Sequence, residues 1–384
     1  MIAFTRKTVL AIIFTVFYTS SDIQAFSDPP LEVNIDSKIM GETRTILISL
    51  PIGYEENSNQ KYPVQYILDG NANIEHTRAT SNFLSEFNEM PQTIIVGITN
   101  VNRTRDMTPS VDLHRNPDSG QADRFLSFIE LEVIDYVEKN YRTENYRTLA
   151  GHSLGGLSVT QAFIRNPKLY DAYFAFSPSY SWNKGEHLPR LMVSLKKNHD
   201  ANNFFYVIKG NEKGKSNNFF LKTEDIFKKY KNDTLNFHSA IYPNETHGTI
   251  PLKGQLEAYR LLFGGWRIDK YKVEKNVSYI EEFIREQTQK YQFNIVLDES
   301  TFYQLTNYFI RKKMNKKAVE VCKIRLKYYP DSHFAFRSMA EAQFASGDNA
   351  SAINYINKAI SLAKDSGHEN LSGYVEKLKS YHQN

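Results

Sequence analysis

Between residues 31 and 263, short apolar segments alternate with segments of helical periodicity. Residues 44–51 (RTILISLP) alternate apolar and polar side chains, which predicts a strand. Residues 62–70 (YPVQYILDG) and 92–99 (QTIIVGIT) are almost continuously apolar, as is typical of strands buried on both faces. Residues 122–141 repeat their apolar side chains every three or four positions, which predicts an amphipathic helix. This alternation favours an α/β fold with a mostly parallel sheet covered by helices on both faces.

The same pattern predicts further elements downstream. They are strands at 146–151, 170–178, 202–210 and 235–243, and helices at 155–167 and 251–263. The segment that contains His187 and His199 is polar, and we expect it to be an insertion with both imidazoles facing solvent.

After Gly265 the strand patterns stop and helical periodicity continues to the C-terminus. Residues 316–331 align with residues 350–365 at a shift of 34, which places Ala318 on Ala352. At the same shift, Leu305 falls on Met339 and Phe302 on Phe336. This period, with small residues where two helices would cross, resembles tetratricopeptide repeats. A plain helical bundle is the alternative.

The N-terminus has the pattern of a secretory signal peptide. Two positive charges in residues 1–7 precede an apolar run at 8–18, and Ile23 and Ala25 suit a cleavage site after residue 25. A retained membrane anchor is the alternative, although the run is short for a membrane span. The expected organisation is a signal peptide (1–25), an α/β domain (26–265), a helical linker (266–298) and a small all-α domain of tetratricopeptide-like repeats (299–384).

Composition narrows the possible settings and partners. Cys322 is the single cysteine among 384 residues, so an intramolecular disulfide is excluded, and an exported chain without one fits a bacterial periplasm or a secreted fraction. The net charge is only +4, and the sequence contains no basic cluster typical of nucleic-acid binding. We expect no membrane association after signal cleavage. The sequence implies no metal or organic cofactor.

Residues 147–156 (RTLAGHSLGG) carry the strongest chemical signal. The segment Gly151-His-Ser-Leu-Gly155 lies between a predicted strand and a predicted helix. A serine at such a turn is exposed above the edge of the sheet, as in the nucleophile elbow of α/β hydrolases. Ser153 is therefore the candidate nucleophile. The alternative is a structural glycine-rich turn.

In this fold the acid and then the histidine follow the serine along the chain. His247, in the polar loop 244–251 before the last predicted helix, is the candidate base. His238 lies within a predicted strand, and we expect the side chain of His152 to point away from the reacting centre.

The acid is expected after the strand at 202–210, and Glu212 is the first carboxylate there. Glu224, Asp225 and Glu245 are the alternatives, as is a Ser–His pair without a strong third member. For the oxyanion we expect the backbone N–H of Leu154 and that of Gly70 or Asn71.

Six segments together resemble the putative-esterase family of α/β hydrolases. That family includes siderophore esterases of the enterobactin type, carbohydrate acetyl and feruloyl esterases, S-formylglutathione hydrolases and mycolyltransferases. The segments are residues 61–71, 96–109, 122–141, 150–163, 170–183 and 245–251. The resemblance implies an α/β-hydrolase fold, with Ser153 as nucleophile and His247 as base.

The resemblance also suggests residues that bind the substrate. Arg103 and Arg105 would lie on the substrate side and could hold an anionic or catecholate group, although Asp106 could instead pair with them. Tyr180 and Trp182 would line a pocket or pack within a lid.

The sequence therefore predicts an exported serine hydrolase of carboxylic esters that forms an acyl-enzyme. A small-molecule siderophore ester is one expected substrate class, and an acetylated or feruloylated glycan is the other. Acyl transfer to an alcohol is a third outcome. The repeats could bind a protein partner, and a non-catalytic scaffold is the rival hypothesis.

Overall fold

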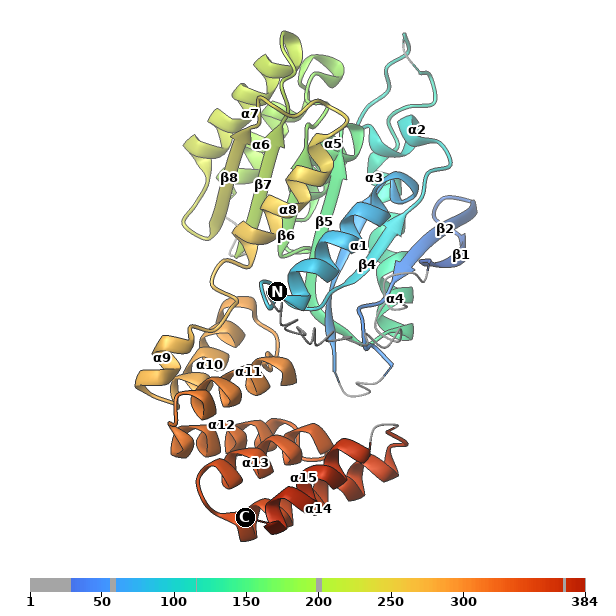
Figure 1. Ribbon diagram of the computed structural model, residues 1–384. Helices are drawn as coiled ribbons and strands as arrows, with labels where there is room; N and C mark the ends of the chain where they lie inside the picture. The colour runs from blue at the N-terminus through green and yellow to red at the C-terminus, as the bar shows by residue number, and fades with distance from the viewer. Residues whose placement is uncertain (1–28, 56–59, 115, 198–201, 369–370, 384) are drawn as a thin grey trace, which may run out of the picture.

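The computed structural model describes residues 29–55, 60–114, 116–197, 202–368 and 371–383. Eight strands form one sheet in the order β1-β2-β4-β3-β5-β6-β7-β8 (Figure 1). Strand β2 is antiparallel to β1 and β4, and every other neighbouring pair is parallel. The strands are β1 (Leu31–Ser37), β2 (Glu42–Ser49), β3 (Tyr62–Leu68), β4 (Ile94–Ile98), β5 (Thr143–His152), β6 (Ala172–Phe176), β7 (Asn203–Lys209) and β8 (Leu235–Ile241).

The central strands are buried on both faces, as their continuous apolar sequences predict. Every residue of β3, β4, β6 and β7 is buried. Tyr66 and Leu68 in β3 face one hydrophobic core, and Ile67 between them faces the other. The chain therefore has the α/β-hydrolase fold, with a core on each side of one sheet.

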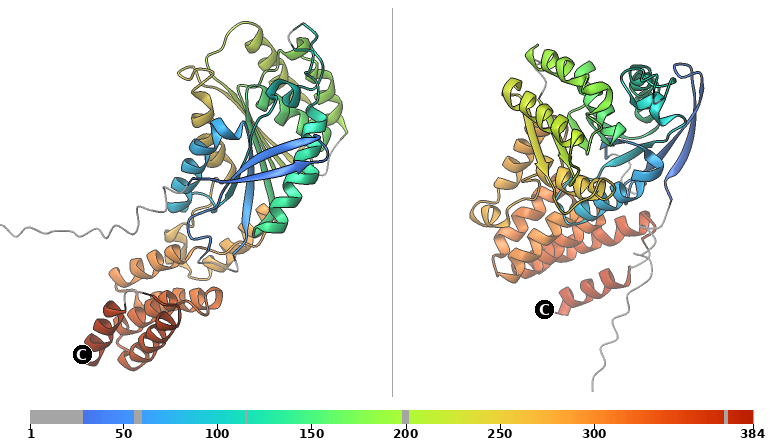
Figure 2. Two further views of the ribbon diagram at one scale, coloured as in Figure 1. Left: turned by 90° about the vertical axis from the view of Figure 1, so that its right-hand side faces the viewer. Right: turned by 90° about the horizontal axis from the view of Figure 1, so that it is seen from above.

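Helices cover both faces of the sheet (Figures 1 and 2). Helices α1 (Gly70–Glu86) and α8 (Ile250–Leu262) pack together on one face. The other face carries α3 (Ala122–Phe128), a π-helical turn (Ile129–Val133), α4 (Ile134–Asn140), α5 (Leu154–Arg165), α6 (His187–Lys196) and α7 (Lys215–Tyr230). Short elements at Arg103–Met107 (α2) and Trp182–Lys184 lie in the loops that follow β4 and β6.

The segment expected to be a polar insertion instead contains helix α6. His187 is buried, its ring stacks on Tyr180 at 4.3 Å between centroids, and its Nε2 lies 2.8 Å from Thr223 Oγ1. Burial lowers the pKa of His187 to about 3, so this imidazole is neutral at physiological pH. The prediction of a solvent-facing His187 was wrong because flanking polar residues concealed one packed face. His199 lies outside the described residues.

Seven helices follow the sheet domain in the described part of the chain. They are α9 (Lys270–Lys275), α10 (Tyr279–Tyr291), α11 (Glu299–Arg311), α12 (Asn315–Tyr328), α13 (His333–Ala345), α14 (Asn349–Asp365) and α15 (Ser372–Gln383). Helices α11 and α13, and likewise α12 and α14, begin 34 residues apart, which is the shift seen in the sequence. Ala318 and Ala352 are both fully buried. A single core joins residues 268–297 to α11–α13, so the expected linker packs with the repeats.

The helical region contacts the sheet at the amino ends of the parallel strands. Tyr291, at the end of α10, packs its ring 5.8 Å from Tyr146, near the start of β5, and 5.5 Å from Phe263. Its hydroxyl donates to the carbonyl of Leu262 at 3.0 Å. Tyr146 precedes Ser153 by seven positions along β5, so at about 3.3 Å per residue this contact lies more than roughly 20 Å from the serine turn. Figure 1 shows the helices below the sheet, away from the strand ends that carry the serine turn.

Among the described residues, no helix is long and apolar enough to cross a membrane. The signal peptide predicted for residues 1–25 lies outside the described residues and remains a prediction.

Replacing Tyr291 by Ala should destabilise the protein by about 3–5 kcal/mol, because it removes a buried ring and leaves a cavity beside Tyr146 and Phe263. Chemical unfolding followed by fluorescence measures this change. Tyr271, 61% exposed on α9, is the matched control, and Tyr271→Ala should cost less than about 0.5 kcal/mol. Equal losses from the two variants would contradict a buried contact at Tyr291.

Candidate active site

The serine turn connects β5 to α5 at the carboxyl edge of the sheet. Ser153 has φ 60° and ψ −115°, a strained conformation for a residue with a side chain. A Cβ on Gly151 would lie 2.6 Å from the backbone of Gly155, so a side chain there could not fit without moving the start of α5. The backbone N–H of Ser153 donates to Phe176 O at 3.0 Å, which ties the turn to the end of β6.

The hydroxyl of Ser153 lies 3.2 Å from that of Ser179, in the loop after β6. The backbone N–H of Ser179 also donates to Ser153 O at 2.9 Å. Sequence analysis missed Ser179, because nothing in the segment 170–183 distinguishes a serine that contacts the turn from an ordinary loop serine. Its contact with the nucleophile candidate depends on two strands pairing side by side.

Two loops bring together the proposed base and acid. His247, between β8 and α8, places Nδ1 2.7 Å from Oε1 of Glu212, which lies between β7 and α7. The loops are joined directly, because the N–H of Asn211 donates to the carbonyl of Glu245 at 2.8 Å. The two side chains selected from sequence therefore form a hydrogen-bonded pair although 35 residues separate them.

The environment of Glu212 keeps it ionised. Burial acts to raise the pKa of its carboxyl, but the hydrogen bond with His247 and the nearby hydroxyl of Ser177 outweigh that effect and hold the pKa below its usual value. A carboxylate facing Nδ1 orients the imidazole and stabilises its protonated form.

The alternative acids lie elsewhere. Glu224, on α7, binds the Ser239 hydroxyl and pairs with Lys228 at 2.9 Å. Glu245 contributes its backbone carbonyl to the loop contact, and Asp225 is the neighbour of Glu224 on α7. His238 is a half-buried residue of β8 that packs on Phe204, as expected for a strand position.

His152 does not point away from the site, contrary to the expectation from sequence. Its ring lies 4.5 Å from the ring of His247, between centroids. Burial, together with repulsion from His247, lowers the pKa of His152 to about 4, so it presents a neutral surface to the base at pH 7. The expectation failed because His152 is the last residue of β5, where its ring packs against the loop that carries His247.

The expected oxyanion donors begin two helices at neighbouring strand ends. Gly70 is the first residue of α1 after β3, and Leu154 is the first of α5 after β5. N–H groups in a first helical turn lack partners within the helix and carry partial positive charge. A Cβ on Gly70 would lie 2.6 Å from the backbone of Gly97, so the close approach of β4 requires glycine there. Asn71 follows on α1 and is exposed.

Arg103 lies beside the serine turn. Its Nε and Nη2 donate to the two oxygens of Asp69 at 2.6 and 3.0 Å, and Nη2 also reaches the carbonyl of His152 at 3.2 Å. Asp69 has φ 57° and accepts a further hydrogen bond from Asn100. About a third of the Arg103 side chain stays exposed, so part of its guanidinium can meet a ligand.

Arg105 is engaged differently. It pairs with Glu42 and with Asp106, and Asp106 also binds the fully buried Arg44 at 2.7 Å. This is the pairing through Asp106 that the sequence allowed as an alternative to substrate binding. The guanidinium of Arg105 holds the loop after β4 against β2.

Tyr180 and Trp182 pack inside the loop after β6. The Tyr180 hydroxyl lies 2.8 Å from Thr160 Oγ1, and the Trp182 indole N–H donates to the carbonyl of Ser110 at 3.2 Å. Both side chains are at least 95% buried. They therefore match the packing alternative rather than an open pocket lining.

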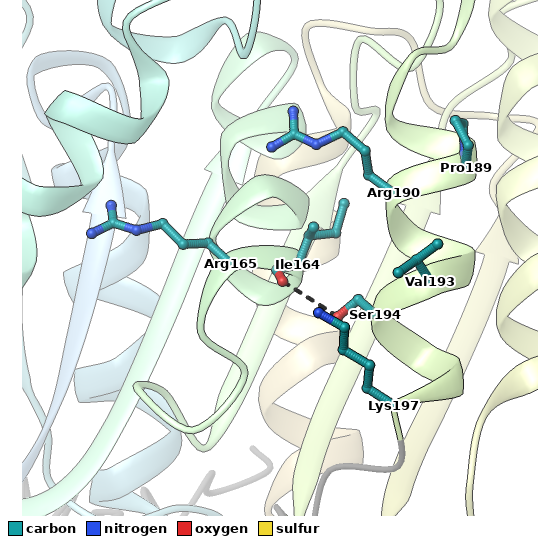
Figure 3. Close-up of a pocket in the computed structure, with 7 residues that line it drawn as sticks. All are labelled: Ile164, Arg165, Pro189, Arg190, Val193, Ser194 and Lys197. Carbon is teal, nitrogen blue, oxygen red and sulfur yellow. Dashed lines mark hydrogen bonds between the residues drawn. The ribbon is translucent and has the colours of Figure 1, made fainter.

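A cavity of about 420 Å³ lies between α5 and α6, away from the serine turn. Figure 3 shows Arg165 and Arg190 extending from the two helices that border it, with Ile164 on α5 and Val193 on α6. Its lining contains none of the predicted site residues. Within the part of the chain that the structure describes, no three His, Cys, Asp or Glu side chains are grouped to hold a metal ion.

A family described as "Putative esterase" matches residues 37–247, more than half of the chain. The chain belongs to this esterase family. The matched range begins in the first strand and ends at the proposed base, His247.

Curated relatives match shorter segments. The ferri-bacillibactin esterase BesA of Bacillus subtilis is 33% identical over an alignment of 181 residues that covers 42% of this chain and 62% of that protein. The siderophore triacetylfusarinine C esterase of Aspergillus fumigatus is 32% identical over an alignment of 157 residues that covers 37% of this chain and 53% of that protein. The matches span less than two thirds of either relative.

Solved structures extend the likeness. An IroE-like serine hydrolase from Shewanella oneidensis superposes with a TM-score of 0.69 at 28% identity, covering 78% of this chain and 99% of that one. A protein from Capnocytophaga ochracea shares the fold over 92% of this chain and 99% of its own, with a TM-score of 0.62 at 15% identity. The latter coverage is too large to be confined to the sheet domain, so the shared fold extends into the helical region.

Replacing Glu212 by Gln should lower kcat/KM for an ester by between about 10²- and 10⁴-fold, because the neutral amide cannot stabilise a protonated His247. Steady-state hydrolysis of a short-chain nitrophenyl ester measures the effect.

Glu224→Gln is the matched control, since it makes the same chemical change on the neighbouring helix and should leave kcat/KM within about twofold of the original. A Glu212→Gln variant as active as this control would rule out Glu212 as the acid.

Proposed function

We propose that this protein is an exported serine esterase that hydrolyses the carboxylic esters of a siderophore. The observation that carries the proposal is the pairing of Glu212 with His247 at the strand edge where Ser153 occupies its strained turn. Membership of the esterase family supports the reaction class.

In the proposed reaction, Ser153 Oγ attacks the ester carbonyl. His247 already engages Glu212 through Nδ1, so Nε2 is the nitrogen that would take the serine proton and later return it to the leaving alkoxide. The Ser153 hydroxyl would exchange its contact with Ser179 for one with His247 when the substrate binds. Water would then attack the acyl-enzyme with His247 as base, releasing the acid and restoring Ser153.

The N–H groups of Leu154 and of Gly70 or Asn71 would stabilise the oxyanion. They begin helices after adjacent parallel strands, and β3 and β5 pair in register up to Ile67 and Ala150. A Cβ on Gly155 would lie 3.2 Å from Oδ2 of Asp69, so the loop after β3 and the serine turn are in close proximity. Donors from both loops could therefore converge on one oxygen.

The substrate class follows from the relatives and from Arg103. The names of the curated relatives specify siderophore esters. Arg103 offers a partly exposed cation beside the serine turn, which suits an anionic or catecholate group. A carbohydrate acetyl or feruloyl esterase is the rival within the same chemistry.

We further propose that the helical region is a short tetratricopeptide-like array that docks a protein partner. Its 34-residue spacing supports the repeat assignment. Its contact with the amino ends of the strands leaves the edge that carries Ser153 uncovered by it. A purely non-catalytic scaffold is disfavoured, because it would give no reason for the strained Ser153 and the Glu212–His247 pair.

Ser153→Ala should abolish ester hydrolysis, lowering kcat by at least about 10⁴-fold, while leaving the unfolding transition unchanged. Ser158→Ala, a change on the same helix away from the turn, is the matched control and should retain activity. Retention of activity in the Ser153 variant would refute the proposed nucleophile.

The unmodified enzyme should hydrolyse a catecholate trilactone with a kcat/KM at least about tenfold above that for acetylated xylan. Arg103→Gln should lower kcat/KM for the trilactone and leave that for acetylated xylan unchanged. Product analysis by mass spectrometry measures both reactions. A preference for xylan would favour the carbohydrate esterase instead.

A further inference from the structure

A buried lysine lies directly behind the proposed catalytic acid. Lys209 is the last residue of β7, and only 1% of its surface is exposed. Lysine is almost never buried to this extent without a partner that compensates its charge. The esterase mechanism does not account for this residue.

Three contacts fix the ammonium group. Nζ donates to the backbone carbonyl of Glu212 and, at 3.0 Å, to Oδ1 of Asn217 on α7. It also lies 3.9 Å from Oε2 of Glu212. The backbone carbonyl of Lys209 accepts from the N–H of Tyr242 at 2.9 Å, which ties the same residue to the chain that leads to His247.

The two oxygens of Glu212 therefore face opposite partners. Oε1 meets His247, and Oε2 faces the lysine side. A fixed positive charge behind the carboxylate offsets part of its attraction for a proton on the imidazole. Because Nζ lies 3.9 Å from Oε2 in a partly desolvated site, this offset is large enough to measure.

We propose that Lys209 is a positioning residue that anchors the acid loop between β7 and α7 and sets the electrostatic field in which His247 takes up its proton. This proposal rests on the proposed function in assigning Glu212 and His247 as acid and base. Lys209 itself touches neither the substrate nor the reacting atoms.

Two ionisable residues in the described part of the chain contact the imidazole of His247. Glu212 faces it from the loop after β7 and His152 from the end of β5. His152 remains neutral, because burial holds its pKa at about 4. Arg103 and Asp69, next to His152, form an ion pair with each other. Lys209 is thus the buried cation whose removal should alter the titration of His247.

The test is to titrate the imidazole of His247 and to monitor it by NMR. The sample is the Ser153→Ala protein with isotope-labelled histidine. A His247→Gln spectrum assigns the signal. Lys209→Gln keeps a hydrogen-bond donor but removes the charge, and it should raise the pKa of His247 by about half a unit. In protein with Ser153 intact, the acid limb of kcat/KM should move upward equally, lowering the rate on that limb about threefold.

Two further variants separate charge from structure. Lys213→Gln removes the same charge from an exposed position in the same loop and should leave the titration unchanged, because solvent screens it. Lys209→Arg retains the charge, so the titration of His247 in this variant should match that in the unmodified protein. A titration of His247 that does not move in Lys209→Gln, or that moves equally in Lys209→Arg, would overturn the proposal. Lys209→Met also removes the charge and should give the same shift, so it replaces the Gln variant if that variant does not fold.

The titration does not depend on turnover. Hydrolysis that survives Ser153→Ala would defeat the proposed function alone. A fall in rate without any shift of the acid limb would show a purely structural role for Lys209.

Discussion

The strained turn at Ser153 is the constraint on which the arrangement of the site depends. It ends the central strand β5 and begins α5 within a single residue, and it is possible only because Gly151 leaves space for the backbone of Gly155. Pairing of β5 with β3 and β6 then brings the loops after those strands to the same edge. The sheet thus determines which residues surround the serine: Asp69 and Gly70 from one side, and Ser177 and Ser179 from the other.

Charge is arranged around this turn in two separate units. On one side, Asp69 and Arg103 neutralise each other while leaving part of the guanidinium exposed. On the other, Glu212 lies between His247 and the buried Lys209. His152 separates the units as a neutral imidazole, because its burial disfavours protonation. In the proposed reaction, this separation would allow His247 to respond to Glu212 while a ligand engages Arg103.

Much of this could be predicted from sequence where local pattern and chain order are sufficient. Continuous apolar runs identified β3 and β4, and the glycine-flanked serine identified the turn. Chain order selected Glu212 and His247, and in the structure Oε1 of Glu212 lies 2.7 Å from Nδ1 of His247. Where packing between distant segments decides, the sequence could not resolve the outcome. His187 is buried by a helix that the polar sequence concealed. Arg105 is held by Glu42 from another strand, and Ser179 gains its contact with Ser153 only through strand pairing.

The most direct test of the account is to treat the protein with a fluorophosphonate probe and to map the adduct by peptide mass spectrometry. The account predicts a single adduct on Ser153 and loss of esterase activity in proportion to labelling, because His247 and the strained turn activate that hydroxyl alone. A folded protein that shows no adduct, or an adduct on another serine with Ser153 unmodified, would contradict it.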